Sequence, residues 1–154
     1  MNRQKKATDE LLAKQAHMMK ERGWIMHYVL YPPFPSGEWV NCHTHGLQTR
    51  FGHLDFQLVY PIGLETANKI MDLLVEQIEA GMKFAPGDQA TEIIKRFPVT
   101  FVAAVEGSNQ VLRIIFPDRD GNLEGDFARK QIEVRFEDDP DNENRLTKAA
   151  PNLN

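Results

Sequence analysis

The chain has a single cysteine, Cys42, among its 154 residues. One cysteine cannot form a disulfide within the chain, so a disulfide-stabilised secreted scaffold is excluded and a reducing compartment is expected. No apolar run approaches the roughly eighteen residues that a membrane-spanning helix needs. The N-terminal stretch 1–15 also lacks the apolar segment of a secretory signal. We therefore expect a cytoplasmic protein that does not enter the membrane.

Basic residues do not outnumber acidic residues in this chain. The chain has 18 Lys and Arg residues against 22 Asp and Glu residues, which gives a formal net charge of −4. Non-specific nucleic-acid binding depends on Lys and Arg that neutralise phosphates, so we do not expect a nucleic-acid partner. Neither of the phosphate-binding patterns GxxxxGK[ST] and GxGxxG is present, and nucleotide chemistry has no motif to support it.

The remaining composition is that of an ordinary globular protein, with 42% hydrophobic and 26% charged residues. The length suits one domain with a proper core. Apolar content almost disappears from Asp138 onward, and such composition is typical of disordered segments. The sequence therefore predicts a single domain over residues 1–137 and a flexible polar tail over 138–154.

Hydrophobic periodicity predicts two helices and about six strands. The helix over 9–22 is expected to start at Thr8 or Asp9 and to stop at Gly23. The helix over 65–81 has apolar residues at three- and four-residue spacing, as a long helix that covers one face of a sheet would have. Strands are predicted at 24–31, 38–46, 53–60, 98–106, 110–117 and 129–137.

The order of these elements predicts the fold class. Strands follow one another in runs rather than alternating strictly with helices, which favours an α+β domain with a mainly antiparallel sheet. The turn GSN between 98–106 and 110–117 indicates a hairpin. The last strand, 129–137, alternates apolar and charged residues as an edge strand with one wet face does. The proline-rich stretch PPFPSG is expected to break regular structure.

Five short motifs occur in the order and spacing of one known family. They are His43-Thr44-His45-Gly46-Leu47, His53-Leu54-Asp55-Phe56, residues 81–88, Pro98-Val99-Thr100-Phe101-Val102 and Pro117-Asp118-Arg119-Asp120-Gly121. Together they resemble the bacterial DUF4262 family over about residues 23–122. The resemblance implies a small bacterial domain and brings no assigned reaction with it. His43, His45 and Leu54 depart from the family pattern, whereas His53 and Asp55 carry over.

Histidines are concentrated in the stretch 41–57. In a strand, alternation puts His43 and His45 on one face, and it puts His53 and Asp55 on one face of the next strand. One register between the two strands would bring all four side chains together as ligands of Zn, Ni or Fe. A slip of one residue would place the two pairs on opposite faces. A histidine that donates to an aspartate is also an ordinary structural pair, and this alternative stays open.

Aromatic and basic side chains suggest a second kind of site. Trp39 ends the cluster YPPFPSGEW, which could form a lip over a pocket or cap the edge of the core. Arg119 lies in the turn PDRDG, where Asp and Gly suit turn geometry and the guanidinium could dock a small anion or a neighbouring chain. With His53 and Asp55, these residues form our candidate ligand-binding set.

Three kinds of function fit these observations. The first is a non-enzymatic module that binds a small molecule or a protein, which the lack of a recognised nucleophile or cofactor motif favours. The second is a metal-dependent enzyme, hydrolase-like, that uses His43, His45, His53 and Asp55 on the hairpin 38–60. The third is a structural domain that forms a homodimer or larger homo-oligomer, in which aromatic residues would supply the contact.

Overall fold

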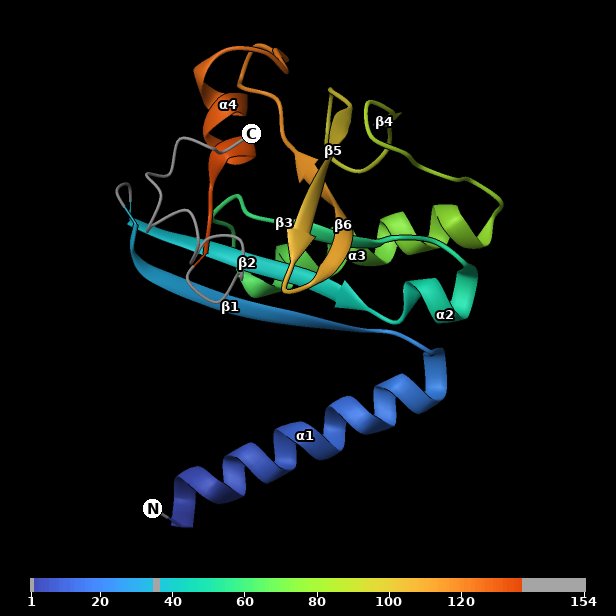
Figure 1. The fold of residues 1–154 in the computed structure, drawn as a ribbon, viewed down its shortest axis with the longest axis vertical. Coiled ribbons are helices and arrows are strands. Elements are labelled where there is room, and N and C mark those ends of the chain that lie inside the picture. The colour runs from blue at the N-terminus through green and yellow to red at the C-terminus, as the bar shows by residue number, and fades with distance from the viewer. Residues whose placement is uncertain (1, 35–36, 137–154) are drawn as a thin grey trace.

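The computed structural model describes residues 2–34 and 37–136, which form one six-stranded sheet and four helices (Figure 1). The strands lie in the order β1-β2-β3-β6-β5-β4. They are β1 (Ile25–Phe34), β2 (Gly37–His45), β3 (Asp55–Leu58), β4 (Gln89–Ala90), β5 (Val99–Glu106) and β6 (Asn109–Ile115). The helices are α1 (Asn2–Arg22), α2 (Leu47–Phe51), α3 (Leu64–Glu79) and α4 (Asp126–Glu133). The predicted tail, 138–154, lies outside the described residues.

The α+β class and the mainly antiparallel sheet are confirmed. Every neighbouring pair of strands is antiparallel except β3 and β6, which run parallel. The predicted hairpin around GSN is the pair β5 and β6. The parallel pair was not predicted, because α3, β4 and β5 lie between its two strands in the sequence.

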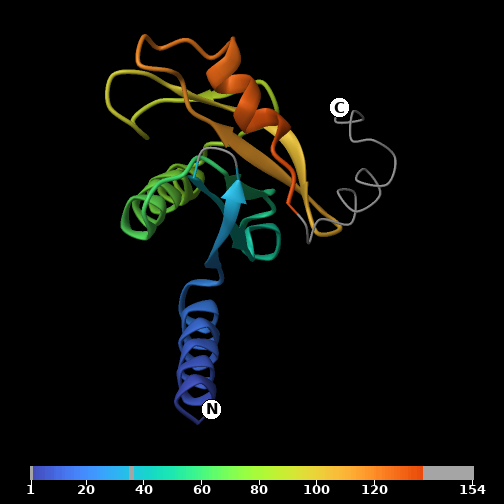
Figure 2. The same ribbon diagram turned by 90° about the vertical axis from the view of Figure 1, so that its left-hand side faces the viewer.

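Helix α3 supplies much of the core, and its bounds agree with the predicted helix at 65–81. Its apolar stripe is buried against residues of the sheet such as Phe56 and Phe101. The buried residues of the stripe are Ala67, Ile70, Met71, Leu74, Val75 and Ile78. Helix α1, in contrast, projects away from the sheet in both ribbon views (Figures 1 and 2), and its Leu12 is 57% exposed.

The prediction of an edge strand at 129–137 is wrong. Most of this segment belongs to α4, in which Ala128 and Gln131 are buried three positions apart, on one side of a helix. The alternation that suggested a strand comes from Ile132, Val134 and Phe136, but Ile132 is exposed and the other two follow the end of the helix. The edge strands are instead β1 and β4, and β4 has only two residues, too few to show periodicity.

The connection between β2 and β3 is a short helix, α2, and not a simple turn. Glycines in the left-handed conformation flank it, Gly46 with φ 110° and Gly52 with φ 69°. A Cβ atom at Gly46 would lie 2.3 Å from the carbonyl oxygen of Gly23, so the two chain segments cross closely there. This crossing sets where β2 ends beside the start of β1.

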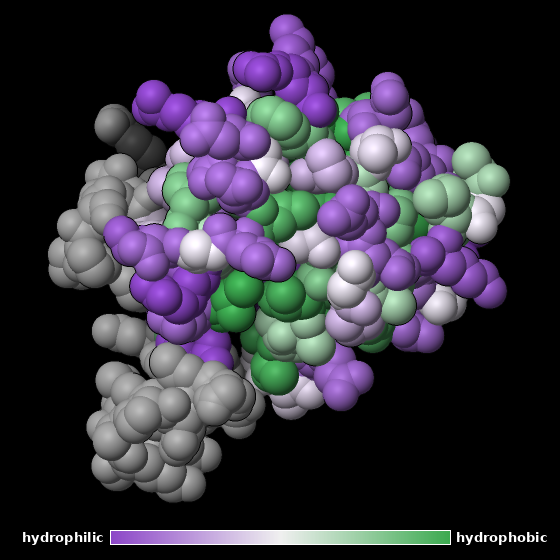
Figure 3. Space-filling model, turned by 90° about the horizontal axis from the view of Figure 1, so that it is seen from above, coloured by the Kyte–Doolittle hydropathy of each residue, from purple (hydrophilic) through white to green (hydrophobic). Residues whose placement is uncertain are grey.

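The sheet has two unlike faces. Val40, Cys42 and Leu58 point into the hydrophobic core that α3 also fills. Alternate residues point to the other face, where the register aligns one side chain from each of four adjacent strands. We call this line the polar row; its members are His27, His43, Gln57 and Arg113. Seen from above, the end of the molecule that carries α4 shows hydrophobic patches between hydrophilic side chains (Figure 3).

Candidate metal centre

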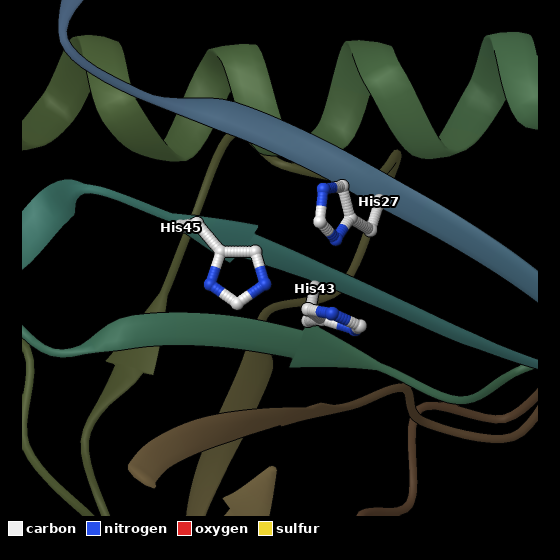
Figure 4. Close-up of side chains that lie close together, drawn as sticks. All are labelled: His27, His43 and His45. Atoms are coloured by element: carbon white, nitrogen blue, oxygen red, sulfur yellow. The ribbon is translucent and has the colours of Figure 1, made fainter. Parts of the chain in front are cut away.

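Three histidines gather on the second face of the sheet, at its β1 edge (Figure 4). His27 of β1 is paired in register with His43 of β2, and His45 follows two residues later on the same side of β2. Ring centroids are 5.3 Å apart for His27 and His43, 4.6 Å for His27 and His45, and 4.8 Å for His43 and His45. One nitrogen from each ring can be chosen so that all three lie within 4.8 Å of one another.

Burial favours the uncharged form of these rings. His43 is 5% exposed, and its pKa is lowered to about 3 by burial first and then by the neighbouring His45 and His27. The pKa of His27 is also lowered, by burial and then by His45. A metal ion binds the neutral imidazole, so a low pKa keeps the ligand ready near neutral pH.

A carboxylate lies beside the histidines. Glu106, the last residue of β5, places its Oε2 atom 3.6 Å from Nε2 of His43. Its Oε1 atom accepts hydrogen bonds from Nδ2 of Asn41 at 2.8 Å and from Nε2 of Gln57 at 3.2 Å. Two side-chain amides therefore hold one oxygen while the other faces the imidazole.

The hydrogen bonds around His43 fix which of its nitrogens carries the proton. Arg113 can only donate, and its Nε donates to Oε1 of Gln57 at 2.7 Å. Gln57 must then donate through Nε2, which it does to Oδ1 of Asn41 at 3.1 Å. That oxygen is an acceptor, so Nδ1 of His43, 3.2 Å away, is the protonated nitrogen. Nε2 of the neutral ring keeps its lone pair, on the side of Glu106.

The same network reaches α4 through Arg113, which is 2% exposed. Its Nη1 donates to the carbonyl oxygens of Gln131 at 3.0 Å, Ile132 at 3.1 Å and Val134 at 3.0 Å. Carbonyl groups at the end of a helix have no partner within the helix, and a cation there is favourable. Arg113 thus anchors the end of α4 to the face of the sheet that carries the histidines.

His43 and His45 lie together as predicted from strand alternation, but His53 and Asp55 lie elsewhere. Nδ1 of His53 donates to the carbonyl oxygen of Leu54 at 2.8 Å, and its Nε2 accepts from the backbone N–H of Phe84 at 3.0 Å. Both nitrogens of this ring are therefore used within the fold.

Asp55 supports the connection between β2 and β3. Its Oδ1 accepts from Oγ1 of Thr44 at 2.8 Å and from the backbone N–H of Leu47 at 3.1 Å. Leu47 is the first residue of α2, so Asp55 satisfies one of the N–H groups left without a partner at the start of that helix.

The two other predicted ligand residues occupy separate surroundings. Trp39 is buried in a small cluster with Val59 and Phe136. Arg119 is exposed and lines an open concavity of about 660 Å³, together with Tyr60, Pro117, Asp118, Asp120 and Phe127. Neighbouring N–H groups, first that of Asn122, lower the pKa of Asp118 by donating to its carboxylate.

Sequence reasoning missed His27 and Glu106. Alternation within 24–31 does place His27 on a defined face, but only the pairing of β1 with β2 brings it opposite His43. The proline-rich stretch hid that pairing, because β1 continues to Phe34 with a register shift after Tyr31. Glu106 is 63 residues from His43 in sequence and reaches it only through the sheet.

The model of a domain of unknown function, DUF4262, matches residues 18–126, which is more than half of the chain. The chain belongs to the DUF4262 family. No curated protein and no solved structure matches it. The three histidines, Glu106 and Arg113 all lie within the matched range, so the candidate centre is part of the DUF4262 domain, whereas most of α1 precedes it. Over its described residues, this DUF4262 protein has no helix with the length and apolar character to span a membrane.

Proposed function

We propose that this DUF4262 protein is a non-enzymatic binding module whose ligand is one divalent transition-metal ion, held by His27, His43 and His45. The observation that carries the proposal is the approach of one nitrogen from each ring to within 4.8 Å of the others. The edge-to-face ring contacts alone would also suit plain aromatic packing. Aromatic packing does not require three nitrogen atoms to converge, whereas a metal site does.

The spacing suits a small metal ion after a modest adjustment. Zinc lies about 2.0–2.1 Å from a histidine nitrogen, so two nitrogens on a tetrahedral ion are about 3.4 Å apart. His27 and His45 are half-buried and can rotate inward, while His43 is held by Asn41. Imidazole ligands suit Zn, Ni, Cu and Fe, and Zn is our first choice for the test. Cys42 points to the opposite face and is not available as a ligand.

A metal-dependent hydrolase is the second candidate, and the position of Glu106 favours it. Catalytic zinc sites hold the metal with three protein ligands and leave one position for water. A carboxylate near that position can accept a proton from the water. Oε2 of Glu106, 3.6 Å from Nε2 of His43, lies close enough for this role.

The test is the metal content of protein purified without a histidine tag, measured by mass spectrometry of the elements before and after chelation and reloading with Zn²⁺. We expect close to one metal ion per chain in the wild type, and its loss in His27→Ala and His45→Ala. His17→Ala is the matched control, because His17 lies on α1 with a largely exposed side chain. Circular dichroism of the metal-free variants checks that each is folded. A wild-type protein that takes up no Zn²⁺ would overturn the proposal.

A further inference from the structure

We infer that the molecule has a second binding site, for a small zwitterion with an apolar side chain, that is, a free apolar α-amino acid. The site lies where the chain leaves β3 and β6, and α3, α4 and the turn at 117–121 contribute to it. Figure 3 shows this end of the molecule, where hydrophobic surface is visible between hydrophilic side chains. The site shares no residue with the three-histidine centre and does not rest on the proposed function.

Two adjoining hollows form the site. The first measures about 240 Å³ and is lined mainly by apolar atoms, and the second is the concavity of about 660 Å³ that Arg119 lines. Tyr60, Pro117 and Phe127 line both hollows, which therefore meet along a common wall. The apolar hollow is completed by Ile62, Thr66, Ile70, Ile94 and Phe116. Pockets for drug-sized ligands measure about 300–1,000 Å³, so this hollow suits a smaller group such as one side chain.

The walls of the apolar hollow are fixed by the fold. Because β3 and β6 are parallel neighbours, their chains leave the sheet at the same edge, which brings Tyr60 beside Phe116. The ring of Tyr60 packs against those of Phe116 and Phe127, with centroids 5.6 Å and 5.4 Å away. Gln131, 1% exposed, accepts from the Phe116 N–H at 2.8 Å and donates to the Phe116 carbonyl at 2.9 Å. It also donates to the carbonyl of Phe127 at 3.2 Å, so one buried amide holds both aromatic walls.

The turn at 117–121 presents two opposite charges beside this hollow. The carboxylate of Asp118 is used within the turn, where Oδ1 accepts from the backbone N–H groups of Asp120 and Asn122, both at 2.9 Å. The side chains of Arg119 and Asp120 are exposed, and neither forms a hydrogen bond or an ion pair with any residue that the structure describes. One cation and one anion are therefore available at consecutive positions.

This arrangement matches the three groups of an apolar α-amino acid. A guanidinium binds a carboxylate through two parallel hydrogen bonds, and a carboxylate accepts from an ammonium group. Arg119 holds the carboxylate of the ligand and Asp120 its ammonium group, while the apolar side chain leaves water for the neighbouring hollow. The hydroxyl of Tyr60, on the common wall, has no hydrogen-bond partner among the described residues and adds a donor there.

The balance of charge decides the class of ligand. An anion without an ammonium group, such as phosphate or a fatty acid, is attracted by Arg119 and repelled by the carboxylates of Asp118 and Asp120. An amine without a carboxylate meets the opposite conflict at Arg119. A zwitterion satisfies both signs, and its apolar side chain accounts for the hollow next to the turn.

The test is the binding of L-leucine and L-phenylalanine to the full-length protein, followed by NMR chemical shifts of the backbone amides. A chelator in the buffer keeps metal ions from carrying the amino acid to the histidines. We expect the amides of 117–127 to shift. Arg119→Gln and Asp120→Asn should each weaken leucine binding by about fivefold. Arg129→Gln and Asp126→Asn are the matched controls, because both residues are exposed on α4 and line neither hollow.

Two analogues of leucine separate the contributions of the two charges. Leucinamide lacks the carboxylate and the α-keto acid of leucine lacks the ammonium group, so both should bind more weakly than leucine. The affinity for leucinamide should not change in Arg119→Gln, and the affinity for the keto acid should not change in Asp120→Asn. L-Alanine, whose side chain leaves the hollow empty, should bind about tenfold more weakly than leucine.

Weaker leucine binding in both turn variants, with wild-type affinity in both controls, supports the inference. The inference is overturned if neither leucine nor phenylalanine shifts any amide at millimolar concentration. Wild-type affinity in both turn variants also overturns it, because leucine then binds elsewhere. A keto acid that binds as tightly as leucine has the same effect, because the ammonium group is then not recognised. The metal content of the protein tests the three-histidine centre separately.

Discussion

Arg113→Met tests the network that surrounds the candidate centre. The substitution keeps an apolar chain of similar length and removes the guanidinium, which is 2% exposed and donates to Gln57 and to three carbonyl groups at the end of α4. Hydrogen bonds to a charged group contribute about 1.5–3 kcal/mol each. Removing the guanidinium also leaves the buried acceptor oxygens without this donor. A single Nη1 atom donates to all three carbonyl oxygens, so these three contacts contribute less than three full hydrogen bonds. The expected loss in the free energy of unfolding is about 3–5 kcal/mol.

Urea denaturation of the metal-free protein measures this loss. With a slope of about 2 kcal/mol per molar urea, the midpoint should fall by about 1.5–2.5 M. Arg129→Met is the control, since Arg129 is an exposed residue of α4 that pairs with Asp126, and it should cost less than about 1 kcal/mol. Hydrogen exchange should show the amides of α4 opening more readily in Arg113→Met alone. A midpoint that differs from wild type no more than the Arg129 control does would show that the network does not stabilise the fold.

Three further predictions concern stability. Gly46→Ala should cost about 2–4 kcal/mol in a thermal melt, because φ is 110° and the new Cβ would meet the Gly23 carbonyl at 2.3 Å; an unchanged melting temperature would contradict the close crossing. Leu74→Ala should cost about 2–5 kcal/mol by urea denaturation, whereas Leu12→Ala on exposed α1 should cost little; equal effects would refute the assigned core. Zn²⁺ at a hundred times its dissociation constant should stabilise the wild type by about 2.7 kcal/mol, and no rise in melting temperature would argue against a native metal site.

Local pattern predicted the faces of the strands well. His43 and His45 share a face because side chains alternate along any strand, whatever its neighbours are. The stripe of α3 could be read for the same reason, since the helical period is set by the backbone. The end of the predicted strand 38–46 lies within one residue of the end of β2 at His45, where Gly46 takes a left-handed conformation.

Pairing between distant segments could not be predicted in the same way. The parallel contact of β3 with β6 and the reach of Glu106 to His43 depend on how the whole sheet assembles. The segment around Ile132 fits both the two-residue period of a strand and the period of a helix. In the helix, Gln131 is buried against Phe116: it donates to the Phe116 carbonyl and accepts from its N–H. Such bonds leave no mark on the apolar pattern of either segment.

The one-way order of hydrogen bonds from Arg113 has an evolutionary consequence. Because Arg113 only donates, it dictates the direction of the Gln57 amide, and Gln57 dictates that of Asn41. If one of these residues is replaced alone, the next residue in this hydrogen-bonded series loses a hydrogen-bond partner or must turn its amide. A single substitution therefore lowers stability until its neighbours also change. Positions 41, 57, 106 and 113 are therefore expected to covary among relatives of this chain, as a set inherited or lost together.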